Sequence, residues 1–389
     1  MKPAAKTRTP KPARRKPASG AVAVKGHAPA FREIIGLIQS ARQRAYQAVN
    51  TELIGLYWRR TKPRSIKTLT TGETISIVSP VATQIRMACL LAICCLFSTT
   101  NAATPAAPKT FAYVLQADAL AETKAAAVVK LTQCERDWIV LDAAFSSEQP
   151  WLPADLKFIR TGKTGRKVIA YLSIGEAEDY RPYWKPEWDA NKDGKPDTNA
   201  PAFLLAENPD WHGNYRVKYW HAEWQKLMLA AVDRIMAQGF DGLYLDIVDG
   251  FETFEFDGKN FNDDRVNPET KQTYRRDMVD WVKAVAARAR STRATALVIP
   301  QNGSQLLAHA DFVSTVDGIG VEDLFSNGNK LQPASHTKYV MEFLKPLQAA
   351  GKPVLDIEYV SNPERKNFVR AQAAKNELVL LLTDRELKT

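Results

Sequence analysis

The stretch GFDGLYLDIVDGFE, residues 239–252, carries the pattern that decides the fold. Gly239 follows the amphipathic stretch WQKLMLAAVDRIMAQ (224–238), and glycine commonly stands where a helix ends. The run LYLDIVD that comes next is short and mostly apolar, which is typical of a buried strand. A helix followed directly by a buried strand is the repeating unit of a parallel sheet.

The same pattern recurs along the rest of the chain. Short apolar runs alternate with amphipathic stretches, and the runs cover residues 111–116, 138–145, 167–178, 240–249, 296–303, 318–325, 353–360 and 378–383. Eight such units favour closure into a barrel, and (β/α)8 barrels have roughly 250 residues. No GxGxxG pattern follows the first run, which argues against a nucleotide-binding sheet. The sequence therefore predicts the α/β class, with a (β/α)8 TIM barrel over residues 103–389.

The charge of the chain is unevenly distributed. The whole sequence has 53 Lys and Arg against 43 Asp and Glu, a net charge of +10. Residues 1–102 hold 17 of the basic residues and 3 of the acidic ones, so the body from residue 103 is mildly acidic. A basic tail can contact nucleic acid through phosphates, but nothing basic distinguishes the body. We therefore do not expect nucleic acid to be the partner of the body.

The first hundred residues divide into four segments. Residues 1–29 form a basic tail that is expected to be disordered, because it has little apolar surface to bury. Residues 30–60 predict one helix, and residues 61–85 a linker. In residues 86–102 an arginine precedes MACLLAICCLF and STTNAA, the order of a secretory signal. That run is shorter than the roughly 20 residues of a membrane span. It predicts a secreted or periplasmic protein, although a buried helix is an alternative.

Residues 31–60, FREIIGLIQSARQRAYQAVNTELIGLYWRR, resemble the opening helix of domain-of-unknown-function family 1016, a bacterial family of PD-(D/E)XK-type nucleases. The acidic metal ligands of such a nuclease do not follow, so the resemblance implies no nuclease activity here. Signals stand at the start of a chain, whereas this one begins at residue 86. One hypothesis is therefore a nuclease-family fragment joined to an exported protein by a fusion or a mis-started reading frame.

Polar and acidic residues end most of the predicted strands. They are Gln116, Asp142, Glu176, Glu178, Asp246, Asp249, Gln301, Asn302, Glu322, Asp323, Asp356 and Glu358. In a barrel these ends meet at one face, where the active site lies. Paired carboxylates at such a face are typical of glycoside hydrolysis, which needs one protonated and one ionised group. The body's histidines (His212, His221, His309 and His336) show no ligand spacing, so we expect no zinc and no cofactor.

Aromatic residues between positions 171 and 224 support a sugar ligand, because sugar rings stack on aromatic faces. Trp184, Trp188 and Trp211 lie in polar loops and are the better candidates for the surface. Trp220 and Trp224 are four residues apart, which is equally consistent with a buried helix face.

Three long motifs make a family resemblance specific. YLSIGEAEDYRPYW (171–184), NPDWHGNYRVKYW (208–220) and GFDGLYLDIVDGFE (239–252) resemble glycoside hydrolase family 114, over essentially all of residues 110–389. The resemblance implies a (β/α)8 barrel with endo-α-1,4-polygalactosaminidase activity. It also implies a polysaccharide that contains α-1,4-linked galactosamine as the partner. We expect this enzyme to be a monomer.

The family pattern also implies roles for single residues. Asp246 matches the acidic strand-end motif and is the candidate nucleophile, and Glu322 in GIGVEDLF is the candidate general acid. Many fungal members carry a second Asp where this chain has Tyr244, which bears on the nucleophile assignment. The candidates for substrate binding are Asp142, Tyr171, Glu178, Tyr244, Asp249, Asn302 and Glu358.

One further motif has the spacing of a calcium loop. Asp189, Asn191, Asp193 and Asp197 match the first nine positions of an EF-hand loop, but Ala200 stands where the bidentate Glu belongs. A metal-free Asp and Gly turn is the favoured reading. Two other functions stay open from the sequence: a non-catalytic carbohydrate-binding barrel, and a nucleic-acid-associated protein that acts through its basic N-terminus.

Overall fold

The computed structural model describes residues 107–146 and 149–387. The predictions for residues 1–29, 30–60, 61–85 and 86–102 fall outside these described residues. All eight predicted apolar runs fall inside them, and each contains a parallel strand.

Two parallel sheets contain these strands. The first has the order β1 (Phe111–Val114), β2 (Trp138–Leu141), β5 (Lys167–Ser173), β9 (Gly242–Asp246) and β10 (Leu297–Pro300). The second has the order β11 (Ile319–Glu322), β14 (Val354–Glu358) and β15 (Val379–Leu382). The strands therefore follow one another in chain order across each sheet, as in a repeated strand and helix pattern.

The two sheets meet through residues next to β10 and β11. Gln301 and Gly320 form a parallel bridge, and the amide of Asn302 donates to the carbonyl oxygen of Gly320 at 2.8 Å. At the other ends, the amide of Leu115 after β1 donates to the carbonyl oxygen of Leu387 at 3.0 Å. Parallel pairing is thus confirmed. A closed ring stays a prediction, since within the described residues no strand ladder joins β15 to β1.

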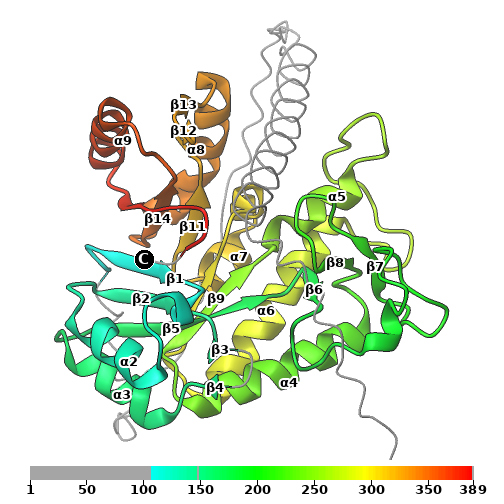
Figure 1. The fold of residues 1–389 in the computed structure, drawn as a ribbon. Helices are drawn as coiled ribbons and strands as arrows, with labels where there is room; N and C mark the ends of the chain where they lie inside the picture. The colour runs from blue at the N-terminus through cyan, green and yellow to red at the C-terminus, as the bar shows by residue number, and fades with distance from the viewer. Residues whose placement is uncertain (1–106, 147–148, 388–389) are drawn as a thin grey trace, which may run out of the picture. The chain divides into compact units, whose positions relative to one another are not determined.

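Helices connect the parallel strands. The longer ones are α2 (Lys124–Gln133), α3 (Pro153–Thr161), α4 (Ala222–Gln238), α6 (Tyr274–Thr292), α8 (Ala334–Ala349) and α9 (Pro363–Lys375). The shorter ones are α5 (Phe251–Glu255), α7 (Ala310–Thr315) and the 3-10 turns η1 (Ala117–Ala119), η2 (Pro186–Trp188), η3 (Val248–Gly250) and η4 (Ser304–Ala308). In Figure 1, α2 and α3 lie next to each other beside β2 and β5. Gly239 ends α4 with a φ of 95°, as its position in the sequence predicts.

Small antiparallel elements follow the carboxyl ends of several parallel strands. They are the sheet β6 (Glu176–Glu178), β8 (Asn214–Val217) and β7 (Leu204–Glu207), and the hairpins β3 (Ala144–Ser146) with β4 (Gln149–Pro150) and β12 (Ser326–Asn327) with β13 (Lys330–Leu331). The sequence predicts one strand over 167–178, but the chain bends between β5 and β6. Gly175 permits this bend, because a Cβ there would lie 2.2 Å from the carbonyl oxygen of Ile247.

Alternation along the strands divides the core into two layers. Phe111 and Tyr113 of β1 pack in an inner cluster with alternate residues of β2, β5, β9, β10, β14 and β15. Ala112 and Val114 point the other way and pack in a larger outer cluster with helix residues such as Leu131. An inner layer shared by so many strands is the arrangement by which barrel interiors are filled.

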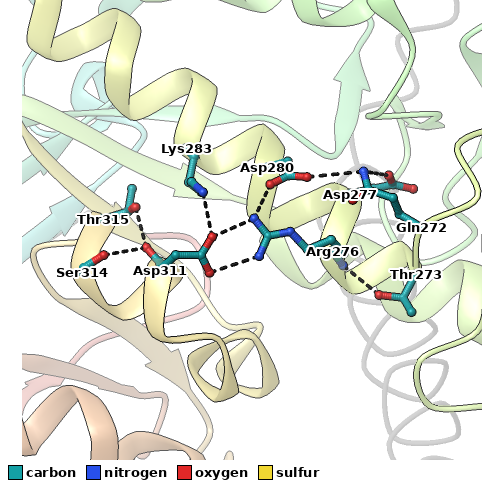
Figure 2. A network of polar contacts seen from close by, with 9 residues as sticks. All are labelled: Gln272, Thr273, Arg276, Asp277, Asp280, Lys283, Asp311, Ser314 and Thr315. Atoms are coloured by element: carbon teal, nitrogen blue, oxygen red, sulfur yellow. Dashed lines mark hydrogen bonds and ion pairs between the residues drawn. The ribbon is translucent and has the colours of Figure 1, made fainter.

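A polar network ties α6 to α7 (Figure 2). The guanidinium of Arg276 reaches Asp311 at 2.7 Å, and Lys283 reaches the same carboxylate at 2.7 Å. Asp280 joins the network through Arg276. The hydrogen bonds from Arg276 and Lys283 hold the pKa of Asp311 well below its ordinary value.

Asp311→Asn is expected to lower the melting temperature by about 2 °C near neutral pH, because partly exposed ion pairs are screened by solvent. Since the folded-state pKa of Asp311 is depressed, its contribution is present above the ordinary pKa and disappears as the pH falls. Thermal melts at pH 7 and pH 3 measure this difference. Asp233→Asn is the matched control, because within the described residues Asp233 forms an ion pair with one cation, Arg288, whereas Asp311 pairs with two. An equal or larger loss for Asp233→Asn would contradict the prediction.

Candidate active site

The carboxyl ends of β9, β10 and β11 share an uncommon backbone conformation. Ile247, Asn302 and Asp323 follow these strand ends, and their φ values are 55°, 58° and 52°. A left-handed conformation is uncommon for residues other than glycine and is unfavourable for a β-branched residue such as Ile247. Strained backbone of this kind concentrates at functional sites. The three bends therefore mark the carboxyl ends of these neighbouring strands as a candidate site.

Asp246 ends β9 and is oriented through both of its carboxylate oxygens. The hydroxyl of Tyr171 on β5 donates to Oδ2 at 2.8 Å, and the amide of Ile247 donates to Oδ1 at 2.8 Å. Burial raises the pKa of Asp246, while these two hydrogen bonds oppose the rise. Asp246 is thereby held in one orientation at the edge of the inner layer.

Glu322 ends β11 and is held in a similar way. The hydroxyl of Tyr359, which directly follows β14, donates to Oε1 of Glu322. The backbone amide of Glu322 donates to Oδ1 of Asn302 at 3.2 Å. Burial raises the pKa of Glu322, the hydrogen bond from Tyr359 opposes the rise and the negative charge of Asp246 adds to it, so that the pKa lies at about 7. A carboxyl group with this pKa is protonated in a large fraction of molecules at neutral pH.

Asp246 and Glu322 face the same part of the site. Each acts electrostatically on Tyr113 and on Tyr244, which raises the pKa of both phenols after the larger effect of burial. Burial raises the pKa of both carboxyl groups, and a tyrosine hydroxyl opposes the rise at each. The structure thus brings together the two residues that the sequence nominates for catalysis.

Tyr244 lies one inward-facing position before Asp246 and is fully buried. Its hydroxyl donates to Oε1 of Gln301. Gly320 makes room for this contact, because a Cβ there would lie 1.8 Å from the Tyr244 hydroxyl oxygen. The predicted binding residue Tyr244 therefore lies in the inner layer and supports the carboxylates above it.

Asp142 and Glu178 lie on opposite sides of one guanidinium. Arg181 reaches Asp142 Oδ2 at 2.7 Å and Glu178 Oε2 at 2.7 Å. The hydroxyl of Tyr180 also donates to Glu178 Oε1 at 2.6 Å. Both predicted binding residues are thus engaged with Arg181 in this structure, and Glu178 acts electrostatically on Asp246.

Two further acids crowd the same face. Glu176 accepts hydrogen bonds from Asn208 at 2.7 Å and Asn214 at 3.3 Å, and burial raises its pKa to about 7. Asp249, in η3, has its pKa raised well above the ordinary value by burial and by the charges of Glu252 and Asp246. Asp246 thus lies among buried carboxyl groups whose raised pKa values favour the protonated form.

Glu358 lies apart from this group. It is fully buried, and its carboxylate accepts hydrogen bonds from the amide of Phe325 at 2.6 Å and from the hydroxyl of Ser326. Tyr359, the next residue, is the one that reaches Glu322. Successive side chains of a strand point to opposite faces, so Tyr359 reaches the site and Glu358 points away from it; a role of Glu358 in substrate binding stays a prediction.

The aromatic predictions have mixed outcomes. Trp211 is 53% exposed, as expected for a surface ring, whereas Trp188 is buried and the expectation for it is wrong. Trp188 is covered because it packs edge-on against Trp184 and Phe203. Trp224 is fully buried, which supports the alternative that it belongs to a core face.

The loop with calcium-like spacing uses its side chains on its own backbone. Asp189 accepts from the amides of Asp193 and Gly194, and Asp197 accepts from the amide of Ala190. Within residues 107–146 and 149–387, no cluster of three or more His, Cys, Asp or Glu side chains has a metal-binding arrangement. The metal-free turn that the sequence favours stays a prediction, and calcium binding by Asp189, Asn191, Asp193 and Asp197 remains the weaker alternative. The helices of this same described part include none that is long and apolar enough to cross a membrane.

A parallel α/β fold with two oriented carboxyl groups at its strand ends is consistent with the class of glycoside hydrolases, whose reaction uses two carboxyl groups. The chain belongs to glycoside hydrolase family GH114, whose family model matches residues 93–389. The match begins ten residues before the predicted domain start at 103. It does not reach residues 31–60, so the resemblance of that segment to a nuclease family is not supported.

Relatives occur in distant organisms. An uncharacterized protein of Deinococcus radiodurans is 34% identical over 250 residues, which are 64% of this chain and 73% of the relative. Uncharacterized proteins of Methanocaldococcus jannaschii and Thermotoga maritima are 35% and 37% identical, over 59% and 50% of this chain. The matched regions span 62% and 55% of those two proteins.

Solved structures share the fold. The glycoside hydrolase domain of PelA from Pseudomonas aeruginosa has 21% identity and a TM-score of 0.50, over 72% of this chain and 97% of that domain. Aspergillus fumigatus Ega3, in complex with galactosamine, has 19% identity and a TM-score of 0.51, over 74% of this chain and 96% of Ega3. At these identities the likeness concerns the fold.

Proposed function

We propose that this protein is a secreted endo-glycosidase that cleaves polysaccharide containing α-1,4-linked galactosamine. The observation that carries the proposal is that Asp246 and Glu322, each oriented by a tyrosine hydroxyl, interact electrostatically at the carboxyl ends of the parallel strands. Membership of GH114 supports the class of reaction. The galactosamine bound to Ega3, a protein of similar fold, supports the class of substrate.

Closure of the parallel strands into a (β/α)8 barrel is part of this proposal. The contact between Leu115 and Leu387 and the inner layer shared by β1 and β15 support it. Secretion rests on the signal-like residues 86–102. The acidic groups around Asp246 suit deacetylated galactosamine, because an amine at C2 is cationic at neutral pH.

In the proposed reaction, Glu322 donates its proton to the glycosidic oxygen as the bond from that oxygen to the anomeric carbon breaks. A carboxylate oxygen of Asp246 forms a bond to the anomeric carbon from the opposite side. Glu322, now ionised, then takes a proton from water, and this water displaces Asp246 and restores both groups. The anomeric configuration is retained in this sequence of steps.

The test is incubation of the purified protein with partly deacetylated α-1,4-galactosaminogalactan, with chitosan as the control polymer because its linkage is β. We expect new reducing ends and short galactosamine oligosaccharides by mass spectrometry, and α-anomers as first products by proton NMR. Binding of the polymer without cleavage would favour a non-catalytic carbohydrate-binding protein. Cleavage of chitosan alone would contradict the proposed substrate.

The pH dependence of kcat/KM is expected to be bell-shaped. Activity requires ionised Asp246 and protonated Glu322, so it rises as Asp246 ionises and falls as Glu322 loses its proton. Since burial raises the pKa of Glu322 to about 7, we expect the alkaline limb to have its midpoint near pH 7. The two limbs belong to the interacting pair and not to isolated groups. A rate that stays constant from pH 6 to pH 9 would contradict the assignment of Glu322 as the acid.

A further inference from the structure

We infer that Arg385, in the segment that follows β15, is a positioning residue for the acid group Glu322 and acts on it through Tyr359. The guanidinium carbon of Arg385 lies over the Tyr359 ring, 4.4 Å from its centroid. The Tyr359 hydroxyl in turn donates to Glu322 Oε1. This inference rests on the role proposed for Glu322.

Arg385 is itself held in place by an ion pair. Its Nη2 lies 2.7 Å from Asp323 Oδ2, and the Arg385 side chain is 31% exposed. Asp323 directly follows Glu322, and its left-handed conformation turns the chain at the end of β11. The ion pair therefore links the segment after β15 to the strand end that carries the acid.

The same arrangement occurs at Asp246. The Tyr171 hydroxyl donates to Asp246, and the guanidinium of Arg181 lies 5.9 Å from the centroid of the Tyr171 ring. Arg181 is in turn held by Asp142 and Glu178. Each of the two candidate catalytic carboxyl groups thus has a tyrosine donor, and each tyrosine has an arginine over its ring. Two independent occurrences at one site make a chance contact a poor explanation.

The chemistry of this arrangement is simple. A cation over the face of a phenol ring is attracted to the ring and withdraws electron density from it, so the hydroxyl becomes a stronger hydrogen-bond donor. A stronger bond to Glu322 favours the ionised carboxylate. The positive charge of Arg385 acts in the same direction through space, whereas Asp246 and Asp323 act in the opposite direction.

The groups around Glu322 come from several elements. They are Asp246 and Tyr244 on β9, Tyr113 on β1, Asp323 beside β11, Tyr359 beside β14, Arg385 after β15 and Asp249 in η3. Arg385 is a cation in a group that otherwise consists of acids and phenols. Its removal leaves the negative charge of Asp323 next to Glu322 without this counter-charge. Every consequence of that removal therefore favours the protonated form of Glu322.

The test compares Arg385→Gln with the wild-type full chain. We expect the alkaline limb of the kcat/KM profile to move upward by about one pH unit, the size typical for loss of a nearby opposite charge. The acidic limb, which reports Asp246, should stay in place. Arg385→Lys keeps the charge but not the planar guanidinium, so it should restore part of the shift. A shift of the alkaline limb alone indicates an effect on Glu322, whereas a general loss of structure would lower the rate at every pH.

Arg290→Gln is the matched control. Arg290 is also 31% exposed and also pairs with an aspartate, since its Nη2 lies 2.8 Å from Asp317 Oδ2. It contacts no tyrosine of the site in the described structure. We expect Arg290→Gln to cost as much stability as Arg385→Gln and to leave both limbs unchanged. An equal shift of the alkaline limb in both variants would overturn the inference.

A second readout does not depend on activity. The carboxyl carbon of Glu322 can be titrated by carbon-13 NMR of glutamate-labelled protein, and Glu322→Gln identifies its signal. The Glu322 midpoint should be higher in Arg385→Gln than in the wild type. If the midpoint moves while Glu322→Gln still cleaves polysaccharide, the proposed acid is wrong but the coupling to Arg385 stands. If the midpoint does not move, the inference is wrong whatever the enzyme cleaves.

Discussion

Asp246→Asn is expected to lower kcat on galactosamine polysaccharide by about a thousandfold or more, because an amide is a far weaker nucleophile than a carboxylate. The substitution preserves the size of the side chain, its oxygen can still accept from the Ile247 amide, and its new NH2 group can donate to the Tyr171 hydroxyl, so the fold should tolerate it. KM should change little. Initial rates of reducing-end formation, with folding checked by circular dichroism, measure the effect.

Glu322→Gln removes the proton donor and should cost between about a hundredfold and ten-thousandfold in kcat. Its pH profile should also lose the alkaline limb. Glu255→Gln is the matched control, because burial raises the pKa of Glu255 to about 7 as well. The Glu255 carboxylate pairs with Arg275 at 2.9 Å instead of facing Asp246. If all three variants lose activity equally, the loss reflects damage to buried carboxyl groups and not the proposed catalytic pair.

A large effect outside the catalytic pair is expected for Gly175→Ala, which should reduce kcat by about a hundredfold. A Cβ at this position would lie 2.2 Å from the carbonyl oxygen of Ile247, so the backbone after Asp246 must move. The amide of Ile174 also donates to the carbonyl oxygen of Asp246 at 3.1 Å. A displacement at this bend therefore reaches the carboxylate directly. Overpacking of this kind also costs about 1–3 kcal/mol of stability.

Gly162→Ala is the control that separates the loss of kcat from the loss of stability. A Cβ there would lie 1.8 Å from the carbonyl oxygen of Thr132, an equally severe clash with backbone, and Gly162 stands at the end of α3. We expect both variants to lower the melting temperature. Only Gly175→Ala should lower kcat per folded molecule. Comparable activity losses in the two variants would mean that Gly175 matters for stability and has no particular role in placing Asp246.

The strained bend after Asp246 explains why this loss is expected. Ile247 is β-branched and nonetheless has a φ of 55°, a conformation that neighbouring contacts must impose. Gly175 and Gly250 both pack closely against the Ile247 side chain. Gly303 packs against Val248 in the same turn. These glycines let the segment from Asp246 to Asp249 pack tightly against its neighbours. The packing of this segment orients the carboxyl groups of Asp246 and Asp249.

Local patterns in the sequence determined a large part of this protein. The eight apolar runs correspond to the parallel strands, and Gly239 ends a helix where its position indicated. The acids at the strand ends indicated where the candidate site lies. In the structure, Asp246 and Glu322 are close enough to interact electrostatically. These features depend on hydrophobic period and on turn chemistry, which act over a few residues. They can therefore be predicted without knowledge of the tertiary structure.

Tertiary structure alone decided which strand-end residues work together. Whether Glu358 or Tyr359 points inward depends on where β14 enters the sheet, and a shift of one residue exchanges the two faces. Arg385 reaches Tyr359 only because β15 follows β14 in the same sheet. Contacts between residues far apart in the chain leave no periodic signal in one sequence. The acids could therefore be predicted from the sequence. The tyrosines and arginines that orient them could be identified only from the packing of the strands.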